Sequence, residues 1–493
     1  MQLKKLVTAT QVQGVEGTLD RDVTSIAYDS RMVRPGAIFF ALPGARTSGA
    51  DYVEQAVERG AEVVVSEQEQ IRSRATNLRV ANARVAMADL AAAFYGNPSK
   101  KLKVAGVTGT NGKTTTTFLI KHLCDTALKR CGLIGTVRYE VGERVLPAAR
   151  TTPESADVQD LLWQMGAAGC KTAAMEVSSH ALVQERVRGV DFEVGVFTNL
   201  TQDHLDFHGS MDAYFDAKCR LFEQLAARSG KAGRGVVNLD DRFGSQLIQR
   251  FRGQIPWATY GQGIQADYRA SNVRMDLQGT QFQLDAHGKS YLVRLPLIGM
   301  FNVYNALAAI AAAHGLGVEV RAAVQALANA PAVPGRMEPV PVKRQYRVFV
   351  DYAHTDDALA NVLRTCRELK PARLIVVFGC GGNRDRGKRA RMGAVAEQLA
   401  DYAVVTSDNP RGEDPMEIIS EIRSGMTLGR HEVVVDRREA ICRAVALARP
   451  RDIVLIAGKG HEQTQEIQGV SIPFNDVSVA RRAVEERTVE LEA

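Results

Sequence analysis

The stretch Val104-Ala-Gly-Val-Thr-Gly-Thr-Asn-Gly-Lys-Thr-Thr115 decides the fold of this 493-residue chain. It begins with apolar residues, continues through closely spaced glycines to Lys113, and is followed by the helical segment Phe118–Leu128. A strand, a glycine-rich loop and a helix in this order are typical of a nucleoside triphosphate site. The N–H groups of the loop and the N-terminus of the helix bind the phosphates. The stretch therefore predicts a nucleotide-binding α/β domain.

Two side chains of this loop have expected roles. Lys113 should reach the β- and γ-phosphates, and the hydroxyl of Thr114 should bind Mg²⁺. The match to the strict pattern G-x-x-x-x-G-K-[ST] is incomplete, because Val107 stands where the first glycine belongs and Gly106 and Gly109 flank it. A plain turn between strand and helix is the alternative interpretation, and the Lys-Thr pair at the helix start argues against it.

Composition is that of a globular protein, with 45% hydrophobic and 24% charged residues, and the length predicts about three domains. No run approaches the roughly 20 apolar residues of a membrane span, and the N-terminus has no apolar signal core, so we expect a cytoplasmic protein without membrane partners. The seven cysteines form no C-x-x-C pair, which predicts reduced thiols without a disulfide framework or zinc site. The net charge of +6 is dispersed except at Arg384–Arg391, which favours polyanionic small substrates over nucleic acid.

Three blocks follow one another along the chain. Residues 1–98 mix short strands with helices and end at the linker Gly96–Ser99. Residues 99–335 alternate strands such as Thr172–Val177 and Val194–Leu200 with helices, and residues 336–493 repeat this alternation. Alternation of this kind predicts mainly parallel sheets with helical crossovers. We therefore expect an α/β protein of three domains, with a central P-loop-type ATPase domain and a C-terminal Rossmann-like domain.

Candidate metal ligands follow two strands of the middle block. Glu176 ends one predicted strand, and His204 follows another after Phe197–Leu200. Catalytic groups often lie at the carboxyl edge of parallel strands, where the phosphate loop also lies, so both side chains could join Thr114 in holding Mg²⁺. An ordinary loop histidine is the alternative for His204. A buried acid at a strand end is usually paired or bound to metal.

Three loops of the third block could form a pocket for a zwitterion. Gly379–Arg386, Ser407–Arg411 and Gly458–Glu462 each follow a predicted strand and carry charged side chains. Arginine binds a carboxylate with two parallel hydrogen bonds, and a glutamate binds an ammonium group. The alternative is that these loops are turns whose charges are solvated.

Several motifs together resemble the Mur ligase family over essentially the whole chain and in matching order. The resemblance rests on residues 108–115, 176–180, 199–209, 351–355, 408–411 and 458–462. The Asp-Asn-Pro-Arg motif at residues 408–411 is the most specific of these, because it marks family members that use meso-diaminopimelate, whereas members that use lysine lack the arginine.

The resemblance implies an ATP-dependent amide ligase of peptidoglycan precursor synthesis. Such an enzyme adds meso-diaminopimelate to the D-glutamyl γ-carboxylate of UDP-N-acetylmuramoyl-L-Ala-D-Glu through an acyl phosphate. It implies ATP as co-substrate, Mg²⁺, and CO₂ bound as a lysine carbamate, and we expect a monomer whose partners are these small molecules. A folylpolyglutamate synthetase-like ligase, a P-loop ATPase switch and a simple nucleotide-binding module remain as alternatives.

The resemblance also implies functional residues, position by position. The catalytic group comprises Lys113, Glu176, His204 and Lys218, of which the last three, with Lys218 as its carbamate, would bind the metal together with Thr114. The ATP group comprises Thr108, Gly109, Thr110, Asn111, Gly112, Lys113, Thr114, Asn302, Asn305, Arg336 and Asp351. The UDP-muramoyl-peptide group comprises Ser30, Ala45, Arg46, Thr47, Thr151, Thr152, Ser178, Gln184 and Arg186. The diaminopimelate group comprises Arg384, Asp408, Asn409, Pro410, Arg411, Gly458 and Glu462.

Three residues depart from the family pattern. Asp356 follows Thr355 where the family usually has proline or asparagine, Asn383 replaces an aspartate, and Arg150 stands where a small or amide side chain is expected. None of them removes an expected ligand.

Overall fold

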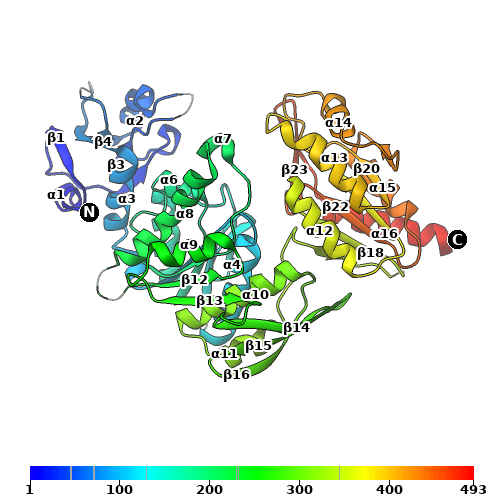
Figure 1. Cartoon of the computed structure of the whole chain (residues 1–493). Helices are drawn as coiled ribbons and strands as arrows, with labels where there is room; N and C mark the ends of the chain where they lie inside the picture. Colours follow the sequence, from blue (N-terminus) through cyan, green and yellow to red (C-terminus); the bar gives the residue numbers. More distant parts are fainter. Residues whose placement is uncertain are drawn as a thin grey trace. The chain divides into compact units, whose positions relative to one another are not determined.

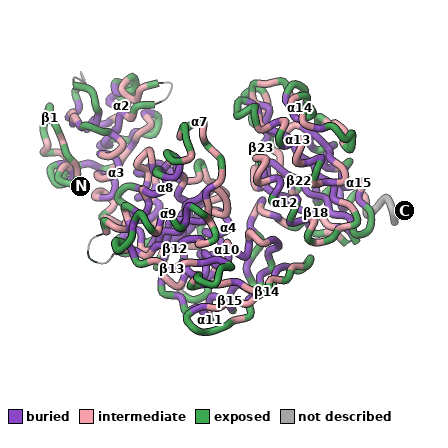
Figure 2. The backbone as a smooth tube through the Cα atoms, in the orientation of Figure 1, coloured by how far each residue is buried: buried purple, intermediate pink, exposed green. Residues whose placement is uncertain are grey.

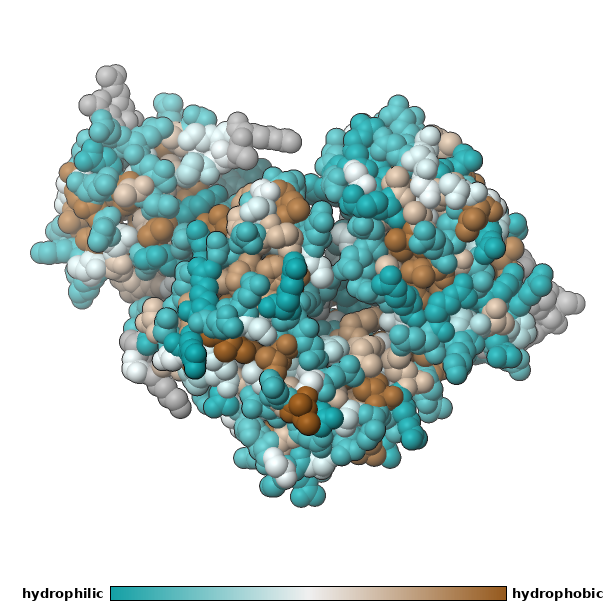
Figure 3. All heavy atoms as spheres, in the orientation of Figure 1, coloured by the Kyte–Doolittle hydropathy of each residue, from teal (hydrophilic) through white to brown (hydrophobic). Residues whose placement is uncertain are grey.

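The computed structural model describes residues 1–44, 47–69, 73–128, 130–228, 230, 232–343 and 345–492. The chain divides into two compact units (Figure 1). One comprises Met1–Asp267 with Ala308–Ala323, and the other comprises Tyr268–Leu307 with Val324–Ala493. Within the described ranges, the helices are too short or too polar to cross a membrane. Hydrophilic residues cover most of the face seen in Figure 3, and hydrophobic ones form small patches.

The N-terminal part of the first unit is built on a five-stranded sheet with the order β1-β5-β4-β3-β2. Its strands are β1 (Val12–Glu16), β2 (Ser25–Ala27), β3 (Ala37–Phe40), β4 (Ala61–Ser66) and β5 (Thr76–Val80), and only β1 pairs antiparallel. Helices α1 (Leu3–Leu6) and α3 (Ala83–Phe94) share a hydrophobic core with one face of this sheet, and α2 (Val53–Glu58) contributes to a second core.

The phosphate loop belongs to a larger sheet of the first unit, in which the strands follow the order β13-β12-β11-β6-β10-β7-β8-β9. Strand β6 (Lys103–Thr108) lies between β10 (Thr172–Glu176) and β11 (Phe192–Phe197) and pairs with both in parallel. The remaining strands are β7 (Cys131–Ile134), β8 (Arg138–Val141), β9 (Arg144–Pro147), β12 (Arg234–Asn238) and β13 (Trp257–Gly261). Helices α4 (Lys113–Leu128), α5 (Ser155–Ala167), α6 (Ser179–Val183), α7 (Leu205–His208), α8 (Met211–Ala226) and α9 (Arg242–Arg250) connect them. Figure 2 shows buried residues on the strands and on the helices packed against them, among them α8.

The second unit contains a six-stranded sheet with the order β17-β18-β22-β19-β20-β21, parallel except for β17. Its strands are β17 (Glu338–Val340), β18 (Arg347–Asp351), β19 (Leu374–Phe378), β20 (Tyr402–Val405), β21 (His431–Val433) and β22 (Ile453–Ala457). One hydrophobic core joins it to α12 (Asp356–Glu368), α13 (Gly387–Leu399) and α14 (Pro415–Arg423), and another to α15 (Arg437–Leu447) and α16 (Asp476–Glu492). The helices therefore form a layer on each face, which is the Rossmann-like arrangement expected from the sequence.

Most predicted elements are present, and the differences have physical causes. The predicted strand Thr172–Val177 is β10, which spans Thr172–Glu176, and the predicted strand Val194–Leu200 corresponds to β11, which spans Phe192–Phe197. Helix α4 begins at Lys113, before the predicted start at Phe118. The β-branched threonines between them are weak helix formers, but they are buried, and the hydroxyl of Thr117 donates to the carbonyl of Thr114 at 2.9 Å. Tertiary packing thus overrides propensity in this turn.

Antiparallel elements were not anticipated from the sequence. Strands β14 (Tyr268–Asp276), β15 (Gly279–Ala286) and β16 (Lys289–Leu295) form a meander, and β23 (Thr464–Ile467) pairs with β24 (Val470–Pro473). The strand predictions rested on continuous apolar runs. These strands have exposed polar faces, so such runs are absent from them. The division into domains 1–98, 99–335 and 336–493 stays a prediction.

A buried ion pair ties α15 to α16 in the second unit. The side chains of Arg437 and Asp476 are both fully buried, and Arg437 donates to the two carboxylate oxygens at 2.8 and 2.7 Å. The guanidinium also donates to the carbonyl of Ala457, the last residue of β22, at 3.0 Å. Two buried charges of this kind depend on each other, because removing one leaves the other in a medium that solvates it poorly.

We therefore expect Asp476→Asn to lower the free energy of unfolding by about 3–5 kcal/mol. Urea denaturation of the full chain measures this loss. Glu486→Gln, in the exposed Arg482–Glu486 pair of the same helix, is the matched control and should change the value by less than about 0.5 kcal/mol. A loss below about 1 kcal/mol for Asp476→Asn would contradict the argument.

Candidate active site

The phosphate loop joins the end of β6 to the start of α4 and is held by the end of β11. Gly109 has a φ of +147°, and a Cβ atom on it would lie 1.8 Å from the hydroxyl oxygen of Thr198. The N–H of Thr110 donates to the carbonyl of Asn199 at 2.9 Å, and the N–H of Asn111 donates to its side-chain oxygen at 2.9 Å. Only glycine fits at position 109, because both the backbone angle and the close approach exclude a side chain.

Two lysines converge on the same carbonyl of this loop. The ammonium of Lys113 donates to the carbonyls of Gly109 at 3.0 Å and Thr110 at 2.8 Å, and Lys218 of α8 donates to the carbonyl of Gly109 at 2.9 Å. Lys218 is buried, and its nitrogen lies 4.3 Å from the ring centroid of Tyr214. Burial, and secondarily the charge of Lys113, holds the pKa of Lys218 well below its ordinary value. The Lys218 amine is therefore predisposed to the neutral form.

Glu176, the last residue of β10, is a fully buried carboxylate with several donors around it. It accepts hydrogen bonds from the Thr114 hydroxyl at 3.1 Å and from Thr136, through its N–H at 2.8 Å and its hydroxyl at 3.0 Å. Carboxylate and hydroxyl oxygens suit Mg²⁺, which prefers hard oxygen ligands. The donor chemistry of Thr114 and Glu176 thus fits the metal that the sequence implies. Sequence reasoning missed Thr136, which lies in no motif.

His204 lies at the start of α7 with a φ of +53°. Its ring centroid is 4.9 Å from that of His180 and 6.2 Å from that of Tyr214, which also contacts Lys218. Burial lowers the pKa of His204 to about 4, so the imidazole is neutral at pH 7. In the part of the chain that the structure describes, no three His, Cys, Asp or Glu side chains gather closely enough to hold a metal ion. A magnesium site here would therefore need hydroxyl, carbamate, water or substrate oxygens as well.

The side chains expected to bind the muramoyl peptide gather beside Glu176. The hydroxyl of Thr152 donates to the carbonyl of Glu176 at 2.8 Å and accepts from the N–H of Ser178 at 3.1 Å. Arg186 donates to the carbonyl of Thr152 at 3.1 Å and to the side chain of Gln184 at 2.5 Å. A further hydrogen bond of 3.1 Å joins the hydroxyls of Thr136 and Thr151. The structure therefore brings this predicted group together.

Three arginines surround one buried carboxylate next to this group. Glu154 pairs with Arg84 at 3.1 Å, with Arg186 at 3.1 Å, and with Arg150. Burial lowers the pKa of Arg186, and the charges of Arg150 and Arg84 lower it further, although Glu154 opposes them. The cluster has more positive than negative charge and suits an anionic substrate. The pairing with Glu154 also explains why an arginine is accommodated at position 150.

The residues expected to bind the UDP end lie in the N-terminal part of the first unit. Ser30 is buried, and its hydroxyl donates to the side-chain oxygen of Gln55 at 2.6 Å, whereas Thr47 is exposed. Ala45 and Arg46 lie outside the described residues. Tyr28 donates to Asp157 of α5 at 2.5 Å, which ties this part to the larger sheet of the same unit.

Four predicted ATP contacts lie in the second unit and form two groups. Asn305 donates to the side chain of Asn302 at 3.0 Å, and Asn302 donates to the carbonyl of Ile298 at 2.8 Å. Asp351 accepts from two backbone N–H groups, and the guanidinium of Arg336 lies 4.7 Å from the ring centroid of Tyr352. Burial raises the pKa of Asp351, and the charge of Arg336 opposes this shift.

The predicted amino-acid pocket is built where β20 and β22 end. Asn409 donates to Glu462 at 2.8 Å, and the buried ammonium of Lys459 donates to the Asn409 oxygen at 2.8 Å and to Glu462 at 2.7 Å. Gly458 has a φ of +118°, and a Cβ atom there would lie 2.6 Å from the carboxylate of Asp408. Lys459 orients the two polar side chains and was missed, although it lies within a motif that sequence reasoning selected.

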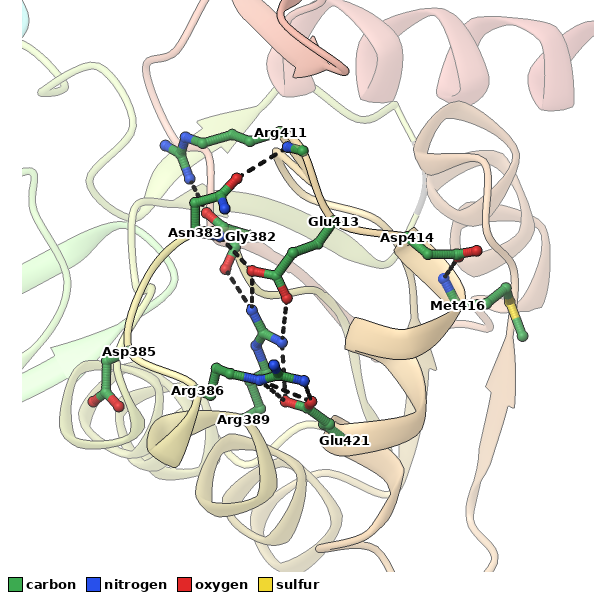
Figure 4. Close-up of polar contacts among 12 residues, drawn as sticks. Gly382, Asn383, Asp385, Arg386, Arg389, Arg411, Glu413, Asp414, Met416 and Glu421 are labelled. Atoms are coloured by element: carbon green, nitrogen blue, oxygen red, sulfur yellow. Dashed lines mark hydrogen bonds and ion pairs between the residues drawn. The ribbon is translucent and has the colours of Figure 1, made fainter.

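Arg411 lies in the loop after β20 and has a backbone conformation that is unusual for arginine. Its φ is +53°, and its backbone N–H donates to the carbonyl of Glu466 in β23 at 3.0 Å. The guanidinium donates to the carbonyl of Gly382 at 2.8 Å and lies 3.2 Å from the Glu466 carboxylate. Pro410 is buried and Arg384 is exposed. The loops after β19 and β20 thus meet around Arg411, as Figure 4 shows.

Three family models match the chain. The Mur ligase middle domain matches residues 107–313, the Mur ligase glutamate ligase domain matches 335–460, and the Mur ligase family catalytic domain matches 22–95. The chain belongs to the Mur ligase family.

Known members of the Mur ligase family match nearly the whole chain. A UDP-N-acetylmuramoyl-L-alanyl-D-glutamate–2,6-diaminopimelate ligase of Syntrophomonas wolfei is 44% identical over 97% of this chain and 98% of its own length. One of the same name from Geobacillus kaustophilus is 46% identical over 94% and 96%. A solved structure of a ligase of this name superposes with a TM-score of 0.72 at 34% identity, covering 99% of each chain. The α/β units described above therefore have the Mur ligase fold.

The phosphate loop of this Mur ligase offers a direct test. We expect Gly109→Ala to weaken ATP binding at least about tenfold. The added Cβ displaces the loop, and losing one charge-assisted hydrogen bond costs about 1.5–3 kcal/mol. Titration with a fluorescent ATP analogue measures the Kd. Gly253→Ala is the control, because Gly253 also has a positive φ, of +76°, but a Cβ atom there would meet open space. An unchanged Kd in folded Gly109→Ala would refute the argument.

Proposed function

We propose that this Mur ligase adds meso-diaminopimelate to the D-glutamyl γ-carboxylate of UDP-N-acetylmuramoyl-L-Ala-D-Glu with consumption of ATP. The structural observation that carries the proposal is the placement of Arg411. The loops after β19 and β20 and the strand β23 hold this cation beside the side chains of the predicted amino-acid pocket. The names of relatives 44% and 46% identical along nearly the whole chain support the same reaction. A folylpolyglutamate synthetase-like activity receives no comparable support.

The phosphate loop and its lysine would bind ATP. The loop N–H groups and the N-terminus of α4 would hold the phosphate oxygens, and Lys113 would transfer its hydrogen bonds from the loop carbonyls to the phosphates. Thr114 and Glu176 would hold Mg²⁺, with His204 and a Lys218 carbamate completing the set. The metal would supply neutralisation of phosphate charge. Asn302, Asn305, Arg336 and Asp351 remain proposed nucleotide contacts.

The reaction needs the D-glutamyl carboxylate close to the γ-phosphate. Attack of a carboxylate oxygen on phosphorus forms an acyl phosphate and releases ADP, and the amine of the incoming amino acid then attacks the acyl carbon and releases phosphate. Thr151, Thr152, Ser178, Gln184 and Arg186 would position the peptide, because they lie beside Glu176 with the surplus positive charge around Glu154. Ser30, Ala45, Arg46 and Thr47 would bind the UDP end.

The incoming diaminopimelate would bind through its charges. Asp408, Asn409 and Glu462 offer acceptors for its ammonium groups, and Arg384 and Arg411 offer cations for its carboxylates. Pro410 and Gly458 would shape the pocket. Domains at residues 1–98, 99–335 and 336–493, a monomeric state and a cytoplasmic location are also part of the proposal.

The decisive experiment is phosphate release by the full chain with ATP and UDP-muramoyl-dipeptide. We expect release with meso-diaminopimelate and little with L-lysine. A P-loop switch would hydrolyse ATP without any amino acid, and a folylpolyglutamate synthetase would respond to folate and glutamate. Either of these outcomes would refute the proposal.

Arg411→Ala should raise the KM for meso-diaminopimelate at least about thirtyfold and leave the KM for ATP unchanged. The variant removes the partner of the distal carboxylate, and losing one member of a desolvated charge pair costs about 2–5 kcal/mol. Steady-state kinetics measure both constants. Arg443→Ala, which removes a half-exposed arginine of α15 from its pair with Glu432 of β21, is the control. An unchanged KM for diaminopimelate would remove Arg411 from the pocket.

Carbamylation of Lys218 is testable directly. A neutral amine attacks CO₂, so ¹³C-bicarbonate should produce a carbamate NMR signal in the native protein and none in Lys218→Arg. We expect Lys218→Arg to lose about a hundredfold in kcat, as when a charge-stabilising group is removed from an active site. Lys121→Arg is the control. Despite burial, the hydrogen bond to Asp125 and the charge of Glu140 raise the pKa of Lys121, which keeps it cationic. The same signal in Lys218→Arg would contradict the assignment.

A further inference from the structure

A cluster of charges around the buried Arg389 lies next to the two loops that meet at Arg411. Arg389 of α13 has a fully buried side chain. Its guanidinium donates two hydrogen bonds, of 2.9 and 3.0 Å, to the carboxylate of Glu413. The same guanidinium donates to Glu421 of α14 at 2.9 Å. Figure 4 shows the guanidinium of Arg389 between the two carboxylates, and Arg386 also donates to Glu421, at 3.0 Å. The expected function uses none of these four side chains.

The cluster reaches both loops through Glu413 and Arg389. Glu413 belongs to the loop after β20, yet its carboxylate accepts the backbone N–H of Asn383 in the loop after β19. Arg389 also donates to the carbonyl of Gly381, at 3.4 Å. In the other direction, the N–H of Gly412 donates to the side-chain oxygen of Asn383 at 3.0 Å. The carboxylate of Glu413 is therefore shared between α13 and both loops.

Arg411 is joined to this hydrogen-bond network through its neighbours in the two loops. It immediately precedes Gly412, and its guanidinium donates to Gly382, which immediately precedes Asn383. Arg411 and Asn383 both have a left-handed backbone, with φ of +53° and +51°. Left-handed backbone is unfavourable for arginine and persists only where the surroundings hold it. Asparagine tolerates it, which gives the departure from the family pattern at position 383 a structural reason.

The electrostatics of the cluster favour a permanent contact. The hydrogen bond from Arg389 is the largest of the effects that lower the pKa of Glu413, to about 2, so the carboxylate stays ionised at every pH at which the protein would work. Two glutamates balance two arginines, and Arg389 has no exposed surface through which solvent could replace its partners. Such two-pronged pairs fix direction as well as distance.

We propose that the Arg389–Glu413 pair is the positioning device that sets the location of Arg411 and thereby the affinity of the pocket for a second carboxylate. Neither residue touches the amino acid. Arg389 orients Glu413, Glu413 holds the backbone of Asn383, and the joined loops place the guanidinium of Arg411. The proposal rests on the proposed diaminopimelate ligase function.

The test replaces Glu413 by glutamine, which keeps the shape and removes the charge, and separately replaces Arg389 by lysine, which keeps the charge and removes the two-pronged geometry. Both variants should raise the KM for meso-diaminopimelate about tenfold, because displacing a binding group by a fraction of an ångström weakens its contact. The KM for ATP and the kcat at saturating diaminopimelate should stay within about twofold of the native values. Glu413→Asp, which retains the charge, should fall between glutamine and the native protein.

Hydrogen exchange supplies a readout that does not depend on the reaction. Backbone amides of residues 379–386 and 406–414 should exchange faster in Glu413→Gln than in the native chain. Glu432→Gln is the control, because it removes a carboxylate of similar exposure, 24% against 18%, from the pair of Glu432 in β21 with Arg443 in α15. It should change neither the KM nor the exchange in these loops.

The possible outcomes distinguish a failure of the positioning role from a failure of the proposed function. An unchanged KM for diaminopimelate, or a fall in kcat with an equal effect on all substrates, would overturn the positioning role. If Glu413→Gln does not fold, Glu413→Asp and Arg389→Lys carry the same comparison. If the native chain releases no phosphate with diaminopimelate, the proposed function fails, and with it the link to affinity. Loop exchange unchanged in the variants would refute the network by itself.

Discussion

The parallel pairing of β6 with β10 and β11 is the constraint on which the first unit depends. Parallel strands place their carboxyl ends at one edge of the sheet. The phosphate loop after β6, Glu176 at the end of β10 and Asn199 after β11 are therefore neighbours in space, although they are far apart in the sequence. The loop then has hydrogen-bond partners from β11, and the Thr114 hydroxyl meets a buried carboxylate. Lys218 is buried because α8 packs against β11, β12 and β6.

The second unit uses the same constraint for a different chemistry. Strands β22, β19 and β20 are parallel neighbours, and the segments that follow them carry charged side chains that pair: Lys459 with Glu462, and Arg389 of α13 with Glu413. A buried charge is tolerated only when it is paired, so the pocket needs an internal set of partners before it can offer Arg411 to a ligand. The first unit differs in this respect, because the three arginines around Glu154 carry more positive charge than this one carboxylate neutralises.

Sequence reasoning succeeded where a motif is local. The phosphate loop, the strand that ends in Glu176, and the loops at 379–386, 407–411 and 458–462 were predicted, because each combines an apolar run with glycines and charges over a few residues. It failed for Arg389, Glu413, Thr136 and Glu154, whose partners lie far away in the chain or belong to no motif. Nothing in the sequence distinguishes Arg389 from Arg386 or Arg391, yet only Arg389 is fully buried. The antiparallel strands β14–β16 were not predicted, because polar residues interrupt the continuous apolar runs on which the strand predictions rested.

By itself the sequence determined the alternation of strands and helices, the nucleotide loop and the family motifs, since these depend on the order and spacing of nearby residues. Only the tertiary structure decided which lysine is buried beside the loop, which arginine pairs with which acid, and why arginine is tolerated at position 150 and asparagine at 383. The physical reason is that burial and pairing of charge are properties of neighbours in space. They fix pKa values and side-chain directions, and no spacing along the chain encodes them.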